Sequence, residues 1–119
     1  MEKPQFSIIR RKDGSSEFEE FLLSIPEKDG AKLLATIEKT EQHGLLVAQR
    51  MQWVKKLDNE IYELRSKVGS NIQRAIYFQE VNNSYLITHG FTKKTQKTPK
   101  QEIEHAKEIK KKFEKGELE

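Results

Sequence analysis

The sequence of 119 residues predicts an α+β fold, in which a small antiparallel β-sheet follows an N-terminal helical hairpin and precedes a C-terminal helix. Two observations predict this class. Segments rich in β-branched and aromatic residues alternate with short turns over residues 61–91. Apolar residues recur at helical spacing before and after that region. We therefore expect the order strand, two helices, three strands, helix, within a single domain spanning residues 1–119.

The N-terminal part has the signals of one strand and two helices. Residues 5–12 alternate in polarity, which predicts a strand. Ser16 stands at the capping-box distance from a glutamate and begins a helix that ends at Pro26. A second helix is expected over residues 27–42, with Gly44 as its C-cap. The two helices should form a hairpin.

The middle of the chain is ambiguous at first and then reads as strands. Residues 45–56 fit neither the helical nor the strand period, so we expect a loop with a short helical turn. Strands are predicted over residues 61–65, 72–81 and 84–91, joined by short turns. Strands that are this close in sequence usually pair with one another, so an antiparallel meander is the simplest arrangement.

The last helix is predicted over residues 99–115. Thr98 can serve as its N-cap, Pro99 is tolerated at the first helical position, and Gln101 can complete a capping box. We expect the helices to pack on one face of the sheet and to leave the other face partly open to a ligand.

Composition and charge point to a polyanionic partner. Hydrophobic and charged residues each make up 34% of the chain, and there is no cysteine. Three scattered histidines do not form a metal cluster, so we expect no metal and no cofactor. The net charge is only +3, but residues 91–115 hold nine lysines and four glutamates, a local charge of +5. RNA, DNA or an acidic protein is favoured as the partner. Without a membrane-length apolar run or a signal-peptide pattern, we expect a cytoplasmic protein.

Cations gather around the connection between the last strand and the last helix. Phe91, Lys93, Lys94 and Lys97 lie there, and a solvated basic loop is the plain alternative to a binding site. Two arginines, Arg65 and Arg74, stand inside predicted strands, where desolvation is costly unless an acid or a phosphate meets them. The structural alternative is a salt bridge, for which Glu63 and Glu60 are available. Strand parity allows only one of Lys93 and Lys94 to face a bound phosphate, and the sequence does not select which.

Several blocks of the sequence resemble a known group of proteins. Residues 57–65, 74–78 and 89–99, with Glu102-Ile103-Glu104-His105-Ala106, resemble the phage-derived HigB-like branch of the RelE/ParE toxin superfamily. The resemblance covers residues 57–113. There are two departures, because this branch usually has a glycine where Glu60 stands and an aromatic residue where Gln73 stands.

The resemblance implies a RelE-like fold and the toxin of a type II toxin–antitoxin pair. Such a toxin cleaves mRNA on the ribosome without a metal, inhibits translation, and is silenced by a helix-turn-helix antitoxin that binds it. Arg65 and Arg74 would then stabilise the charged phosphorane, and Lys93 or Lys94 would act as a base or add charge. Phe91 would stack on a base, and Lys97 would contact phosphates. One alternative is a ParE-like, non-enzymatic inhibitor of DNA gyrase. Another is an inactive phage-derived binding protein of the same fold.

Overall fold

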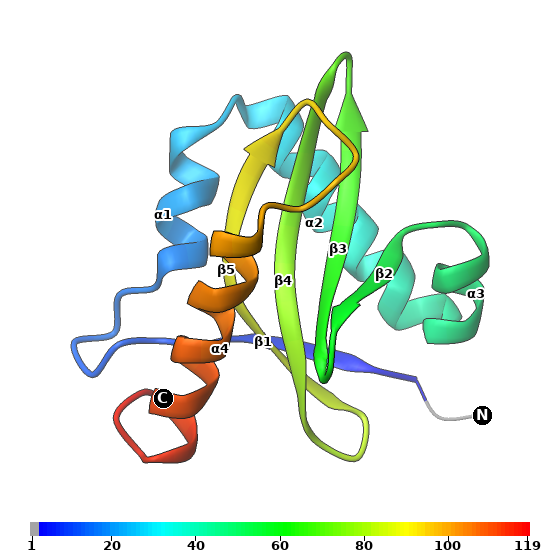
Figure 1. Ribbon diagram of the computed structural model, residues 1–119. Helices are drawn as coiled ribbons and strands as arrows, with labels where there is room; N and C mark the ends of the chain where they lie inside the picture. Colours follow the sequence, from blue (N-terminus) through cyan, green and yellow to red (C-terminus); the bar gives the residue numbers. More distant parts are fainter. Residues whose placement is uncertain (1–2) are drawn as a thin grey trace.

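The computed structural model describes residues 3–119 and has an α+β fold built on a five-stranded sheet (Figure 1). The strands, in their order across the sheet, are β1 (Gln5–Ile8), β5 (Ser84–Lys93), β4 (Asn71–Val81), β3 (Ile61–Val68) and β2 (Val54–Asp58). β1 is parallel to β5, and the other neighbours are antiparallel. The predicted α+β class and the meander of β3, β4 and β5 are confirmed.

The helices cover both faces of the sheet, so the prediction that they cover only one face is wrong. α1 (Glu17–Ser24) and α2 (Glu27–His43) pack on one face, against β5 and β3, respectively. α4 (Lys100–Glu114) packs on the opposite face, as Figure 1 shows. The reason lies in β4, where every residue from Ile72 to Phe78 is buried. A strand that is buried on both faces needs cover on both sides.

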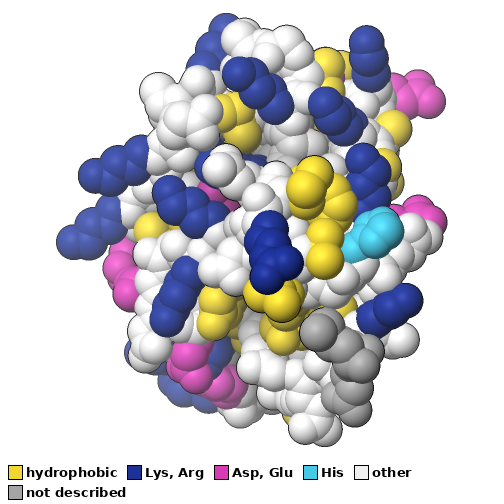
Figure 2. All heavy atoms as spheres, turned by 90° about the vertical axis from the view of Figure 1, so that its right-hand side faces the viewer, with side chains coloured by type: hydrophobic (Ala, Val, Ile, Leu, Met, Phe, Trp, Pro, Cys, Tyr) yellow, Lys and Arg dark blue, Asp and Glu magenta, His cyan; other side chains and the backbone are white. Residues whose placement is uncertain are grey.

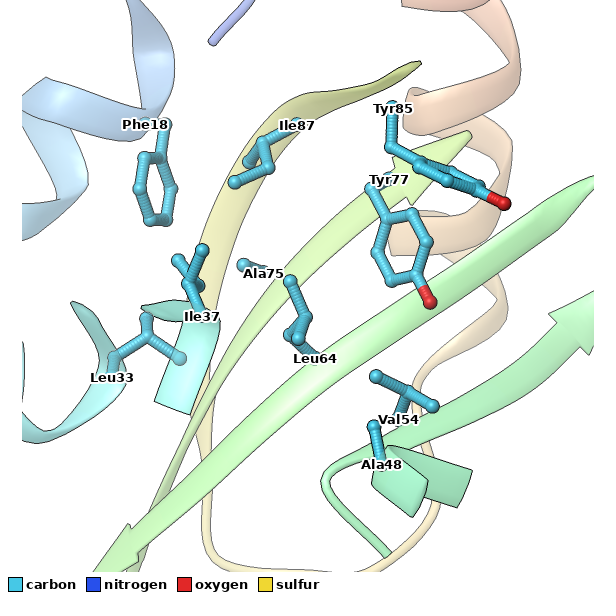
Figure 3. Packing of buried hydrophobic residues seen from close by; sticks show 10 residues of the cluster. All are labelled: Phe18, Leu33, Ile37, Ala48, Val54, Leu64, Ala75, Tyr77, Tyr85 and Ile87. Atoms are coloured by element: carbon cyan, nitrogen blue, oxygen red, sulfur yellow. The ribbon is translucent and has the colours of Figure 1, made fainter. Parts of the chain in front are cut away.

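Two hydrophobic clusters hold these layers together. The cluster on the α1/α2 side contains the ten residues shown in Figure 3, where Phe18 and Leu33 point from the helices toward the strands. The cluster on the α4 side joins Ile76 and Phe78 of β4 to Ala106 and Ile109 of α4, among other residues. Within residues 3–119, no helix is long and apolar enough to cross a membrane.

The predicted helix ends on the N-terminal side are confirmed, while the first strand is shorter than predicted. The Ser16 hydroxyl accepts a hydrogen bond from the Glu19 N–H, and Gly44 ends α2 with a φ of +89°. β1 ends at Ile8, and the hydrogen bond from the Ile9 N–H to the Ile87 carbonyl oxygen of β5 follows it. Arg10 exchanges two backbone hydrogen bonds with Glu119, and its guanidinium binds Glu19.

The short helical turn expected within residues 45–56 is confirmed as α3 (Leu45–Arg50), but the loop expected around it is wrong where the chain enters β2 at Val54. β2 pairs with β3 and has an irregularity between Lys56 and Asp58. Lys55 and Lys56 are both exposed, so β2 lacks the alternation by which a strand is recognised in a sequence.

The start of α4 also differs from the prediction. Pro99 occupies the N-cap position, and no side chain caps the helix there. The Thr98 hydroxyl instead donates to the buried carboxylate of Glu63, at 2.6 Å. Thr98 is therefore an anchor for the connection that precedes α4.

Candidate functional site

The register of the sheet brings the predicted arginines together. Arg65 of β3 lies directly opposite Arg74 of β4, and Arg74 lies opposite Phe91 of β5. Phe91 belongs to the α4-side cluster, so all three side chains lie on the α4 side of the sheet. Lys93 is two residues beyond Phe91 and therefore lies on this side as well. Lys94 follows the end of β5 and is exposed.

Arg74 is enclosed by protein and supports the connection above it. Its side chain is 0% exposed, and its Nη2 donates to the carbonyl oxygens of Thr95 and Gln96 at 2.6 and 2.7 Å. Burial lowers the pKa of Arg74, and the negative charge of Glu63 acts in the opposite direction. We call residues 94–99 the basic loop. Arg74 holds this loop from beneath and has no surface for contact with a phosphate.

Glu63 lies between the two arginines and is also completely buried. Its Oε1 is 3.6 Å from Arg74 Nε, and its Oε2 is 3.8 Å from Arg65 Nη1. The same Oε1 accepts the hydrogen bond from Thr98. The salt-bridge alternative for the two arginines therefore occurs, through Glu63. One carboxylate faces two guanidinium groups, which leaves one positive charge uncompensated by this acid.

Arg65 differs from Arg74 because part of its side chain, 17%, is exposed. Its Nε donates to the Gln52 carbonyl oxygen at 3.3 Å, and its Nη1 donates to Gln96 Oε1 at 3.4 Å. Both distances are long for hydrogen bonds. The Arg65 fork is thus held loosely, and an anion could replace these partners.

A hollow of about 320 Å³ lies between β2 and the basic loop. We call it the basic hollow, and it is lined by Lys55, Lys56, Leu57, Gln96, Lys97, Thr98 and Ile103. Among the described residues, none of those that line it carries a carboxylate. Figure 2 shows this side of the molecule, with many Lys and Arg side chains and hydrophobic side chains among them. Sequence reasoning missed Lys55 and Lys56 because it did not predict β2.

Phe91 is placed differently from its predicted role. Its ring is only 8% exposed and packs in the cluster under α4, with the Arg74 guanidinium carbon 5.9 Å from the ring centre. Its faces are therefore not available to a base. Gly90 beside it is also structural, because a Cβ at this position would lie 2.3 Å from Phe21 of α1. Gly90 and Phe91 therefore contribute to the resemblance over residues 89–99 through packing and not through contact with RNA.

The two departures from the toxin branch lie away from the exposed cations. Glu60 has a φ of +63°, the left-handed region that favours the glycine usual in that branch. Gln73 is buried, and it donates to Asp29 of α2 and accepts from Thr92. Its side chain therefore points toward α2, away from Arg65.

An exposed basic loop beside a hollow lined by lysines is the kind of surface with which proteins bind polyanions. The family described as Phage derived protein Gp49-like (DUF891) matches residues 20–111. The match covers most of the chain, so the protein belongs to this family, which is of the RelE/ParE-like toxin–antitoxin kind. A search of curated proteins found no match to the chain.

Proposed function

We propose that the protein is the toxin of a type II toxin–antitoxin pair, of the HigB-like branch, and that it inhibits translation as a ribosome-dependent, metal-independent mRNA endoribonuclease. The observation that carries this proposal is the partly exposed Arg65 guanidinium beside the basic hollow. Gln96 joins the two, since it lines the hollow and accepts a hydrogen bond from Arg65. Membership of a toxin–antitoxin family supports the same conclusion.

In the proposed reaction, the ribose 2′-OH attacks the adjacent phosphorus. The O2′–P bond forms and the P–O5′ bond breaks, which gives a 2′,3′-cyclic phosphate and a 5′-OH end. The 2′-OH proton would pass to Lys93 or Lys94 acting as the base, or to water if these lysines only add charge, and the leaving 5′-oxygen would take a proton from water. The phosphorane carries more negative charge than the bound diester, so a cation placed beside it accelerates the reaction.

The cations take two kinds of role in this proposal. Arg65 is the group that contacts the reacting phosphate, because its planar fork can bind two phosphate oxygens. Lys97 and Lys55 line the basic hollow and would bind neighbouring phosphates. Arg74 is a positioning residue, since it is buried and fixes the backbone of the basic loop.

The proposed partners follow from the proposed class. The substrate is mRNA on the ribosome, and the silencing partner is a helix-turn-helix antitoxin that forms a complex with the toxin in the cytoplasm. An antitoxin that covers the basic hollow would block RNA by occupying the same cations. A short gene for such a protein is expected next to the gene for this chain.

A second candidate function is inhibition of DNA gyrase without RNA cleavage. It is favoured by the exposed apolar side chains Leu46, Val47 and Met51 in and just after α3. Such a binder needs mainly an exposed helical surface, and α3 provides one. The two candidates predict different damage in the cell.

The test is to induce the protein in a bacterium and to map RNA ends and DNA breaks. We expect growth arrest and new mRNA ends inside reading frames, and we expect both to disappear in Arg65→Ala expressed at the same soluble level. DNA breaks with intact mRNA would contradict the endoribonuclease and support inhibition of DNA gyrase. Normal growth with verified soluble protein would contradict both candidates.

A further inference from the structure

The edge of β3 beyond β2 is open. β2 pairs with β3 only as far as the pair Val54 and Leu64, and the Arg65 N–H then donates to the Trp53 carbonyl oxygen. β3 continues for three further residues, Ser66 to Val68, past the end of this pairing (Figure 1). The Lys67 carbonyl oxygen points outward there and accepts a hydrogen bond from Lys32 of α2. An open sheet edge at this position offers polar groups to a ligand.

A second hollow of about 320 Å³ lies along this edge, and we call it the edge hollow. Four of its lining residues are cations, namely Lys32, Lys39, Arg65 and Lys67. Among the described residues, no Asp or Glu lines it. Arg65 and Gln96 line the edge hollow and also connect it to the basic hollow. One polyanionic chain could therefore cross from one hollow to the other.

Ser66 gives this hollow an unused hydrogen-bonding group. The residue is only 7% exposed, and its Oγ has no hydrogen-bond partner within residues 3–119. Buried hydroxyl groups are nearly always paired, because an unpaired one loses its hydration without compensation. The hydroxyl oxygen itself has almost no exposed surface, but Ser66 lines the edge hollow. Rotation of this side chain toward a ligand oxygen placed in the hollow would satisfy the hydroxyl.

Trp53 supplies an aromatic surface in the same place. It is half-buried and lines the edge hollow, and the ammonium group of Lys39 lies 5.6 Å from the centre of its ring. Aromatic rings among cations are the means by which proteins hold single-stranded RNA, since bases stack on the rings while cations bind the phosphates. An acidic peptide would use the cations but has less need of an indole ring.

We propose that the edge hollow is a second RNA subsite, in which a base of the single strand stacks on Trp53 while Lys32, Lys39 and Lys67 bind its phosphates and Ser66 donates to a phosphate or ribose oxygen. The inference rests on the proposed function, because it extends the path of the same RNA beyond Arg65. It adds a place where nucleotides next to the cleaved bond are held.

The experiment uses the fluorescence of Trp53, which is the only tryptophan of the chain. The full-length protein is titrated with a six-nucleotide 2′-O-methyl RNA that cannot be cleaved, and binding is measured in parallel by the anisotropy of a labelled copy. We expect saturable quenching with the same midpoint as the anisotropy change. Trp53→Ala should weaken binding about 5- to 150-fold, the range that corresponds to loss of one stacked base.

Two variants test the phosphate and hydroxyl contacts. The double variant Lys32→Ala/Lys39→Ala should make the slope of log affinity against log salt shallower by about 0.7 for each lost contact. Lys111→Ala/Lys115→Ala removes two exposed lysines of the C-terminal region and should leave the slope unchanged. Ser66→Ala should raise the urea midpoint of the free protein and yet weaken RNA binding, a combination that a purely structural serine would not give.

The outcomes separate this inference from the proposed function. RNA that binds without quenching, and equally well to the Lys32/Lys39 and Lys111/Lys115 variants, would overturn the edge subsite even if cells still show Arg65-dependent cleavage. Quenching by an acidic peptide but not by RNA would also overturn it and assign the edge hollow to a protein partner. Quenching by RNA without cleavage in cells would support the subsite and refute the nuclease.

Discussion

Arg65 and Arg74 are direct cross-strand neighbours, yet the protein uses them in opposite ways. Arg74 belongs to the central strand β4 and is covered by the basic loop, to which it donates two hydrogen bonds. Arg65 belongs to β3, beside the place where β2 begins, and is partly exposed. The comparison shows that the position of a strand within the sheet decides whether its arginine supports the structure or can meet a ligand.

The two arginines also differ in what they contribute to stability, because the buried Glu63 lies between their guanidinium groups. A buried ion pair contributes little net stability, since desolvation opposes the attraction of the charges. Removal of one partner is nevertheless costly, because it leaves the other charge buried and unpaired. Arg74 and Glu63 thus form a buried support beneath the basic loop, and this support holds the exposed cations of the loop in a fixed arrangement.

The largest effect is expected for Arg74→Ala. The substitution leaves the buried Glu63 carboxylate with the Thr98 hydrogen bond and with Arg65, 3.8 Å away, as its remaining cation. We therefore expect a loss of about 3–5 kcal/mol in the free energy of unfolding. Urea unfolding followed by circular dichroism measures it. The double variant Arg74→Met/Glu63→Gln removes both charges and should recover much of the loss. A loss below about 1 kcal/mol, the size expected of an exposed ion pair, would mean that Arg74 is not a support.

Arg65→Ala should affect activity and leave stability nearly unchanged. One charge-stabilising donor in an active site contributes about 100-fold or more to the rate, so mRNA cleavage should fall by about that factor. Its stability change should stay within about 1 kcal/mol, because its partners are long hydrogen bonds and a carboxylate at 3.8 Å. Cleavage is measured by primer extension after induction. Arg65→Lys is the matched control and should retain part of the activity, since it keeps the charge but loses the fork.

The sequence predicts that the two arginines lie close together, but not that one is buried and the other partly exposed. The meander follows from short turns between β-rich segments, and it places Arg65 near Arg74. Burial of Arg74 depends on a loop that begins 20 residues later and folds back over it, which no local pattern encodes. The run Ile72 to Phe78 also contains Gln73 and Arg74, so its burial on both faces is hidden by polar residues.

Two other differences have similar causes. Thr98 precedes a proline in a typical helix opening, but a carboxylate 35 residues away in the sequence competes for its hydroxyl group and binds it. β2 escapes detection because two consecutive lysines, Lys55 and Lys56, are exposed, which interrupts the alternation typical of a strand. Local rules predict helix ends and turns well where, as at Ser16 and Gly44, the partner group is close in sequence.

Thr98→Val tests the hydrogen bond that links the buried Glu63 to the basic loop. The valine removes the hydrogen bond to Glu63 and keeps the shape of the side chain, so we expect a loss of about 1.5–3 kcal/mol, the value for a hydrogen bond to a charged group. Cleavage should fall as well, because the loop is less firmly held. Thr98→Ser is the control and should preserve most of both properties. Equal stability of the valine and serine variants would contradict an anchoring role.

Glu60→Gly should change stability in the opposite direction and leave cleavage unchanged. Glu60 lies in the turn between β2 and β3 with a φ of +63°, and a glycine there relieves a strain of about 1 kcal/mol. The lost contact with Lys110 is 3.6 Å long, its Glu60 side is exposed, and Lys110 keeps its shorter ion pair with Glu114, so the loss costs little. We expect a net gain of about 0.5–1 kcal/mol in the free energy of unfolding. Glu60→Ala loses the same carboxylate but keeps the strained backbone, so it should show no gain. Because Arg65 and the basic hollow are untouched, cleavage by the more stable variant should equal that of the original protein, and a change in cleavage would show that activity follows the stability of the hairpin and not the exposed cations.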